Sequence, residues 1–286
     1  MTVFDPANLG LAAAGLPLLR DLIHERTGLF YDDARLDAVA EKLAPLIIER
    51  GFRSFLDFYY LLKYDAGAPG EWRRVLDSLS VQETYFWREV DQIRAFVCRV
   101  MPELARAAAG TPIRIWSAPC ASGEEPLTIA IALSEAGWFD RVPVEIYASD
   151  GSTAAIAKAR GARYRERAFR ALPPQMRDRY FHRDGDCWVP VPALSARITS
   201  WSVVNLMDAA ETAAFAQSHA VFCRNAFIYF SPQSVKQVVD GFATAMLPPG
   251  YLFIGASESL LSITDRFSLE PLDRAFVYVR REVRST

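Results

Sequence analysis

Three polar residues in the second half of the sequence each follow a short apolar run that predicts a strand. Glu125 comes shortly after the first run, Asp150 ends the second, and Asn225 follows the third. Ligands of open α/β sheets lie beyond the carboxyl ends of the strands. We therefore expect these side chains to meet at one edge of a sheet, where carboxylate and amide groups can bind the polar groups of a cofactor.

The turn before Glu125 is suited to a ligand that approaches the backbone closely. Residues 118–123 are mostly small and end in a glycine, and Pro126 fits the first turn of the helix expected to follow. The adjacent carboxylates Glu124 and Glu125 would repel a pyrophosphate at this helix N-terminus, so a nucleotide without phosphates is favoured. Both acids could instead only complement the helix dipole, an alternative that this segment by itself leaves open.

Asp150 and Asn225 can each be explained in two ways. Asp150 lies one strand beyond the turn, where the ribose of an adenosine ligand would find a carboxylate, but it could equally be the N-cap of the next helix. Asn225 follows Arg224 and interrupts an apolar and aromatic run, and such polar residues at a strand end need partners. The alternative to a ligand contact is a turn asparagine whose partner is the arginine.

The spacing of apolar residues predicts the elements that must position these side chains. From Leu16 to Lys63 apolar residues return every three or four positions, so the first ninety residues are predicted to be helical. After Gly110 short apolar runs alternate with helical segments, which predicts an α/β domain with a mainly parallel sheet. The expected strands are 113–117, 144–149, 220–223 and 250–254, with a late strand over 274–281, and the expected helices are 126–135, 153–160 and 234–246.

The stretch from Tyr164 to Val204 does not fit this alternation. It is rich in proline and arginine, and we interpret it as an inserted subdomain. The predicted organisation is therefore a helical N-terminal domain with its linker over residues 1–90, followed by a second domain over 91–286 with the insertion at about 164–204.

Composition excludes several classes of function. The 286 residues are 51% hydrophobic, and 32 basic against 34 acidic residues give a net charge of −2, so no nucleic-acid partner is expected. The four cysteines form no CxxC pair and the three histidines lack metal-ligand spacing, which predicts reduced thiols and no metal site. The apolar stretch over residues 9–19 is too short to span a bilayer, so we expect a cytoplasmic protein without membrane insertion.

Six sequence blocks follow one another in an order that is hard to obtain by chance. They are Glu83-Thr-Tyr-Phe-Trp-Arg88, Ile115-Trp-Ser-Ala118 with Gly123-Glu-Glu-Pro126, Ala148-Ser-Asp150, Asn205, Phe222-Cys-Arg-Asn225 with Ile228-Tyr-Phe230, and Pro249 to Ser259. With these blocks the chain resembles the CheR family of chemotaxis receptor methyltransferases over nearly its whole length. The resemblance implies a helical N-terminal domain, a Rossmann-like methyltransferase domain and a small antiparallel β subdomain in the insertion.

The resemblance also implies a cofactor and a reaction. The cofactor is S-adenosylmethionine, which leaves as S-adenosylhomocysteine, and the acceptors are glutamate side chains on cytoplasmic helices of chemoreceptors, which become methyl esters. The residues at the family's cofactor positions are Gln82, Thr84, Arg88, Glu125, Asp150, Asn205, Leu206, Asn225 and Ala226. Because a glutamate is ionised at neutral pH, no general base is needed, and Arg88 and Tyr229 are the catalytic candidates that orient the acceptor carboxylate.

Departures from the family pattern concern the ribose contacts and the docking surfaces. Gln82 replaces the usual asparagine, and the second acid expected two residues after Asp150 is missing, so weaker contacts near the ribose are expected. The helix around Lys42 has lost most of the arginines that dock acidic receptor helices in the family, which predicts weak steering by charge. The short stretch from His182 to Trp188 has one glycine, so a pentapeptide tether at receptor C-termini is not expected to be needed.

Three other functions stay open on the sequence alone. The chain could methylate another nucleophile, or it could be a catalytically weak or inactive protein that binds S-adenosylmethionine as a sensor or scaffold in a chemosensory pathway. It could also be a dinucleotide or nucleotide-sugar enzyme, since the architecture alone permits this. An inactive protein is disfavoured because the sequence retains the family's polar site residues Arg88, Glu125, Asp150, Asn225 and Tyr229. The dinucleotide enzyme is disfavoured because the sequence lacks a GxGxxG motif.

Overall fold

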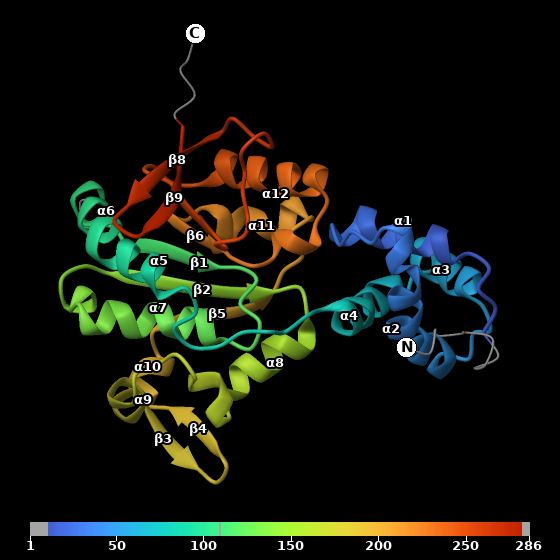
Figure 1. Cartoon of the computed structure of the whole chain (residues 1–286), viewed down its shortest axis with the longest axis horizontal. Helices are drawn as coiled ribbons and strands as arrows, with labels where there is room; N and C mark the ends of the chain where they lie inside the picture. The colour runs from blue at the N-terminus through green and yellow to red at the C-terminus, as the bar shows by residue number, and fades with distance from the viewer. Residues whose placement is uncertain (1–10, 109, 282–286) are drawn as a thin grey trace.

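The N-terminal part of the chain is helical, as its apolar periodicity predicts. The computed structural model describes residues 11–108 and 110–281, and its first four helices form a group at one side of the molecule (Figure 1). They are α1 (Leu16–Thr27), α2 (Leu36–Glu49), α3 (Phe55–Tyr64) and α4 (Ala68–Leu79). Their apolar faces enclose a core of their own, in which Leu19, Ile23, Leu43 and Phe58 are completely buried.

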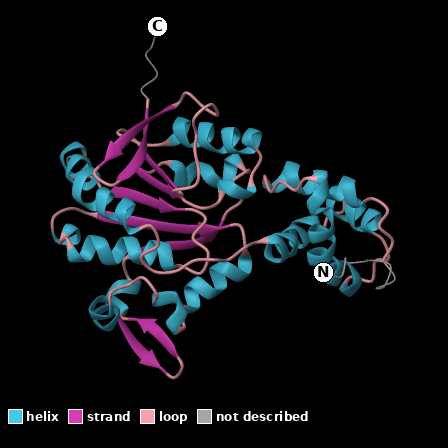
Figure 2. Cartoon of the chain, viewed as in Figure 1, coloured by secondary structure: helices cyan, strands magenta, loops and turns pink. Residues whose placement is uncertain are grey.

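A seven-stranded sheet forms the centre of the second part (Figure 2). Its strands are β1 (Ile113–Ser117), β2 (Val144–Asp150), β5 (Ile198–Val203), β6 (Ala220–Cys223), β7 (Tyr251–Ile254), β8 (Phe267–Leu272) and β9 (Ala275–Arg280). They lie in the order β5-β2-β1-β6-β7-β9-β8, and β9 runs antiparallel to both of its neighbours while the other pairs are parallel. The chain therefore switches direction across the sheet between β1 and β6, where ligands of such sheets bind.

The strands that the sequence predicted are all present, and the two that it missed lie at the edges of the sheet. β5 and β8 are each hydrogen-bonded to one neighbour only, and several of their side chains reach solvent. A half-exposed edge strand does not need a continuous apolar run, so these segments lack the pattern by which the inner strands were found.

Helices cover both faces of the sheet (Figure 1). One face packs against α5 (Val90–Ala95), the π-helical turn Phe96–Val100, α6 (Met101–Ala107), α7 (Glu124–Glu135) and α8 (Thr153–Gly161), and the other against α11 (Ala209–Ala216) and α12 (Pro232–Ala245). Successive strand residues alternate between these cores, so that Ile115 faces the first and Trp116 the second. Within the described residues, no helix combines the length and the apolar character that crossing a bilayer requires.

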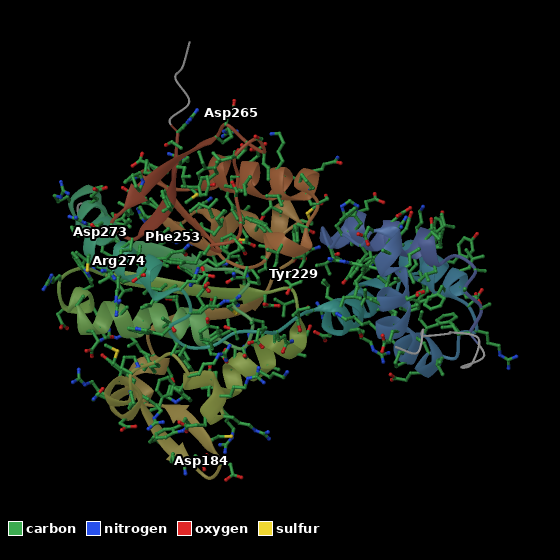
Figure 3. The ribbon with its side chains drawn as sticks, in the orientation of Figure 1. Asp184, Tyr229, Phe253, Asp265, Asp273 and Arg274 are labelled. Carbon is green, nitrogen blue, oxygen red and sulfur yellow. The ribbon has the colours of Figure 1, made fainter. Side chains whose placement is uncertain are left out.

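The insertion after α8 contains the small antiparallel sheet that the resemblance implies. It includes α9 (Pro174–Tyr180), the hairpin of β3 (Phe181–Asp184) and β4 (Cys187–Pro190), and α10 (Pro192–Ser195). Asp184 at the tip of the hairpin lies at the end of the molecule away from Tyr229 (Figure 3). The predicted range of about 164–204 was too long, because residues 198–203 form β5 and pair with β2 in the main sheet. The domain boundary at residue 90 stays a prediction.

Candidate functional site

A cavity of about 260 Å³ lies where the carboxyl ends of β1, β2 and β6 face the helical part and the segment that joins it to α5. Every residue that the sequence singled out as a cofactor contact or catalytic group lines this cavity. They are Gln82, Thr84, Arg88, Glu125, Asp150, Asn205, Leu206, Asn225, Ala226 and Tyr229. The fold therefore brings together side chains that are far apart in the sequence, while their individual roles stay predictions.

The turn between β1 and α7 needs its glycine for packing within the protein. Gly123 has a φ of 97°, and a Cβ at this position would lie 2.9 Å from the Trp201 ring and 3.0 Å from the Tyr164 hydroxyl. Protein side chains, and not a ligand, thus fill the space beside this glycine. The turn still borders the cavity through residues 118–121.

The two adjacent glutamates of α7 have different environments. The Glu125 carboxylate accepts a hydrogen bond from the Ser117 hydroxyl at 2.7 Å and from Arg224 Nη1 at 3.1 Å, and it lines the cavity. Glu124 turns away, is only 4% exposed and accepts from the Ser122 hydroxyl at 2.8 Å. Burial raises the pKa of both carboxyls, although Arg224 opposes this at Glu125. Only Glu125 is therefore placed to meet a ligand.

Asp150 is held by backbone amides at the end of β2. Its carboxylate accepts hydrogen bonds from the N–H groups of Ala121 and Ser152, each at 2.9 Å. Burial raises the pKa of Asp150, and these two hydrogen bonds partly counteract the rise. Ser152, which accepts from the Ala155 N–H at 3.0 Å, is the N-cap of α8. The alternative of Asp150 as the N-cap is thus wrong, and its carboxylate instead ties the turn after β1 to β2.

The hydrogen-bond partners of Asn225 are carboxylates. Arg224, which was the partner in the alternative explanation as a turn asparagine, is not among them. Its φ of 58° is unusual for a residue with a side chain, and its N–H donates to Glu258 Oε2 at 2.9 Å. Its Nδ2 donates to Glu89 Oε1 at 3.1 Å. Arg224 pairs with Glu89 and Glu125 instead. Glu89 and Glu258 were not predicted as site residues, although an arginine directly after an apolar strand is itself a signal that carboxylates lie nearby.

Arg88 and Tyr229 both line the cavity. Arg88 Nη1 donates to the Glu83 carbonyl at 2.8 Å, and the guanidinium lies 5.8 Å from the centre of the Tyr85 ring. Tyr229 lies where the α/β part faces the helical part (Figure 3), and its carbonyl accepts from the Phe30 N–H at 2.8 Å. Both side chains are only partly buried, so a substrate group could reach either.

The helical part contacts the site through the end of α1 and the glycine that follows it. Asn205 Nδ2 donates to the Arg26 carbonyl at 2.8 Å. Gly28 lies against Phe230, since a Cβ there would come within 2.6 Å of the ring. The Asn205 amide therefore joins the two parts of the chain in this structure, a contact that the sequence did not predict.

The helical part also supplies a wall of the cavity. Its lining residues are Thr27, Leu29, Tyr31, Arg35, Lys42, Leu76 and Leu79. Of these, the sequence singled out only Lys42, as a docking residue, and its Nζ donates to the Leu79 carbonyl at 3.2 Å. Burial raises the pKa of Tyr31. Periodicity along a helix does not identify such residues, because it does not show which of them face the carboxyl edge of the sheet.

Two family models match the chain, and curated relatives match most of its length. The model described as "CheR methyltransferase, all-alpha domain" matches residues 14–80, and the model described as "CheR methyltransferase, SAM binding domain" matches residues 82–276. "Chemotaxis protein methyltransferase 2" of Vibrio cholerae is 32% identical over 91% of this chain and 91% of its own length. "Chemotaxis protein methyltransferase 1" of Pseudomonas aeruginosa is 29% identical over 94% and 99%, and "Chemotaxis protein methyltransferase" of Escherichia coli is 30% identical over 91% and 90%.

Proposed function

Because this chain belongs to the CheR methyltransferase family, we propose that it transfers the methyl group of S-adenosylmethionine to glutamate side chains of chemoreceptors. The products are glutamate methyl esters and S-adenosylhomocysteine, and the reaction takes place in the cytoplasm, on the helices of the receptors. One observation carries the proposal: a single cavity joins the carboxyl ends of three parallel strands to a wall that includes the positively charged side chains of Arg35, Lys42 and Arg88.

The groups at the sheet edge suit this cofactor. S-adenosylmethionine supplies a methyl group activated by a sulfonium and carries no phosphate. Glu125 and Asp150 present carboxylate oxygens to the cavity, and such oxygens accept hydrogen bonds from ribose hydroxyls or an ammonium group. We assign Asp150 to the ribose. The other proposed cofactor contacts are Gln82, Thr84, Arg88, Glu125, Asn205, Leu206, Asn225 and Ala226.

The other wall of the cavity suits a carboxylate acceptor. Arg35, Lys42 and Arg88 all line it and bring three positive charges to the side where the helical part meets the sheet. An ionised glutamate needs no base to attack a methyl group, so the task of the protein is to align the carboxylate and to exclude water. Arg88 would bind one acceptor oxygen and the Tyr229 hydroxyl would donate to the other. Arg88 must hold the anion loosely, because its charge disperses in the transition state.

Two surfaces, the exposed face of α2 and the β3–β4 hairpin, support the proposal that charge contributes little to receptor binding. Within α2, the exposed acidic residues Asp37, Glu41 and Glu49 outnumber the exposed basic residue Lys42. A surface with this balance would steer an acidic receptor helix weakly. In the insertion, β3 and β4 are joined only by residues 185–186, which leaves little loop for a tether. We therefore propose that binding depends on the cavity mouth and not on a pentapeptide.

A methyl-transfer assay tests the proposed function. The protein is incubated with S-adenosylmethionine labelled in the methyl group and with the cytoplasmic domain of a chemoreceptor from the same cell. The expected result is label on the receptor that alkali releases as methanol, since esters hydrolyse readily. A receptor domain with its candidate glutamates changed to alanine is the control and should remain unlabelled.

Other outcomes of the assay identify the alternatives. Label that survives alkali would mean that a different side chain is the nucleophile. Binding of S-adenosylhomocysteine in calorimetry without any transfer to the receptor would support a sensor or scaffold, and would overturn the proposed reaction.

A further inference from the structure

Arg224 directly follows β6 and borders the cavity, and it is also the buried centre of the site. Its side chain is only 2% exposed. Nη1 donates to Glu125 at 3.1 Å, while Nη2 donates to Glu89 at 3.2 Å and to the backbone carbonyl of Arg88 at 2.7 Å. A buried guanidinium is costly unless it is paired. Here its pairing connects α7, the segment before α5 and the end of β6.

The segment before α5 is a turn with an unfavourable backbone. Trp87 has a φ of 69° and Glu89 a φ of 49°, both in the left-handed region that residues with a Cβ seldom adopt. Arg88 lies between them, so the direction of its side chain depends on this turn. On one side the Trp87 N–H donates to the Thr128 hydroxyl of α7 at 3.2 Å. On the other side, Arg224 holds the Arg88 carbonyl.

Glu89 fixes the end of the same turn. Its carboxylate accepts from Asn225 Nδ2 and from the Ala256 N–H, each at 3.1 Å, in addition to Arg224. Burial acts to raise the pKa of Glu89, but the charge of Arg224 and these hydrogen bonds outweigh it, so that the pKa is lowered. Glu89 and Glu125 thus share Arg224 as their cation.

We propose that Arg224 is a positioning residue that holds the Trp87–Glu89 turn, and with it the Arg88 side chain, in a fixed position relative to Glu125. It would thereby align the group that orients the acceptor with a group that binds the donor. The inference rests on the proposed function in requiring Arg88 to contact the acceptor. A lysine at position 224 would keep the charge, but a single ammonium does not have the planar fork that binds two carboxylates and a carbonyl together.

Two variants and one matched control test the proposal in the full-length protein. Arg224→Lys weakens the contacts of residue 224 with Glu125, Glu89 and the Arg88 carbonyl. Glu89→Gln removes only the negative charge at the end of the Trp87–Glu89 turn. Arg114→Lys is the control, because Arg114 is also partly buried, at 25% exposure, and pairs with Glu145 at 3.7 Å, but does not line the cavity. Hydrogen exchange of peptides that cover residues 85–90 reports on the turn without any need for a substrate.

Both test variants should exchange faster over residues 85–90 than the wild type, and Arg114→Lys should not. Their kcat for receptor methylation should fall about ten- to hundredfold, because small misplacements of an orienting group are costly. The affinity of both variants for S-adenosylhomocysteine should stay within about threefold of the wild-type value. In Arg224→Lys, Glu125 still has a positively charged partner, and in Glu89→Gln its pairing with Arg224 is not changed.

The results that overturn the proposal are distinct from failure of the proposed function. Unchanged exchange over residues 85–90 in both variants, or faster exchange with an unchanged kcat, would each overturn it. A kcat that falls equally in Arg114→Lys would show a general loss of stability and would also overturn it. If the wild type methylated no receptor, the proposed function would fail, and the exchange data would still decide whether Arg224 holds the turn. If Arg224→Lys does not fold, Glu89→Gln decides alone.

Discussion

The two walls of the cavity differ in how firmly their side chains are held. On the sheet side, Glu125, Asp150 and Asn225 each have hydrogen-bond partners within the protein, so their positions are set before a ligand arrives. On the helical side, Arg35 and Lys42 are exposed, although Lys42 donates one hydrogen bond to the Leu79 carbonyl. A small donor can be enclosed by a preorganised wall, whereas an acceptor on another protein needs an open one. We therefore expect substitutions on the sheet side to change donor binding and those on the helical side to change acceptor binding.

The strongest test of this division removes the charge of Asp150. Asp150→Asn should weaken binding of S-adenosylhomocysteine about ten- to hundredfold, because hydrogen bonds to a charged group contribute the most. Titration calorimetry measures the change, and Asp140→Asn, at the exposed end of the 3₁₀ helix Trp138–Asp140, is the control. An affinity equal to that of the wild type would remove Asp150 from the donor site.

Arg88 is proposed both as a cofactor contact and as the group that orients the acceptor, so its removal should lower turnover. Arg88→Ala should lower kcat at saturating donor and receptor at least about tenfold, because the acceptor carboxylate is no longer oriented. Initial rates of labelled-methyl transfer measure the effect. Arg94→Ala changes a mostly exposed arginine of α5 and should leave the rate as it is. Near-normal turnover in Arg88→Ala would exclude it from the mechanism.

The raised pKa values of Glu125 and Asp150 predict a pH effect that is confined to the sheet side. Burial makes both carboxyls take up a proton at a higher pH than a free carboxyl, whose pKa is about 4. Since only the ionised forms accept hydrogen bonds with all their oxygens, affinity for S-adenosylhomocysteine should fall as the pH is lowered towards that range, before ordinary carboxyls protonate. Calorimetry at a series of pH values measures it. Glu125→Gln should flatten the profile, and an unchanged slope would contradict the assignment.

Substitutions on the helical side should have smaller effects, and only on the acceptor. Lys42→Ala or Arg35→Ala should raise the KM for the receptor domain about two- to fivefold, as expected for exposed charges, and leave the affinity for S-adenosylhomocysteine unchanged. Steady-state kinetics at saturating donor give the KM. Arg106→Ala, which changes an exposed residue of α6, is the control. A change in donor affinity without a change in KM would reverse the proposed division between the walls.

The last prediction is that a receptor C-terminal peptide has no measurable affinity for the protein. A pentapeptide with the sequence of a receptor C-terminus should show no binding, because β3 and β4 are joined only by residues 185–186. Calorimetry with the free peptide measures this, and a dissociation constant below about 100 μM would contradict the prediction.

The sequence by itself determined the inner part of the sheet and the residues at its edge. Inner parallel strands are buried on both faces, so β1, β2, β6 and β7 appear as apolar runs, and polar residues after such runs must lie at the carboxyl edge. Glu125, Asp150 and Asn225 could be found in this way, and the sequence blocks gave the family. The edge strands β5 and β8 could not be found from the sequence, because a strand with one side exposed to solvent does not need a continuous apolar run.

Only the tertiary structure decided which groups hold these residues. The sequence does not show that Arg224 bridges Glu125 and Glu89, or that Asn205 reaches the Arg26 carbonyl in α1. It also does not show that the helical part supplies one wall of the cavity. Periodicity reports whether a side chain faces a core, which is a property of its own element. The partner of a buried polar group is set by packing between elements that are distant along the chain, and this leaves no periodic pattern in the sequence.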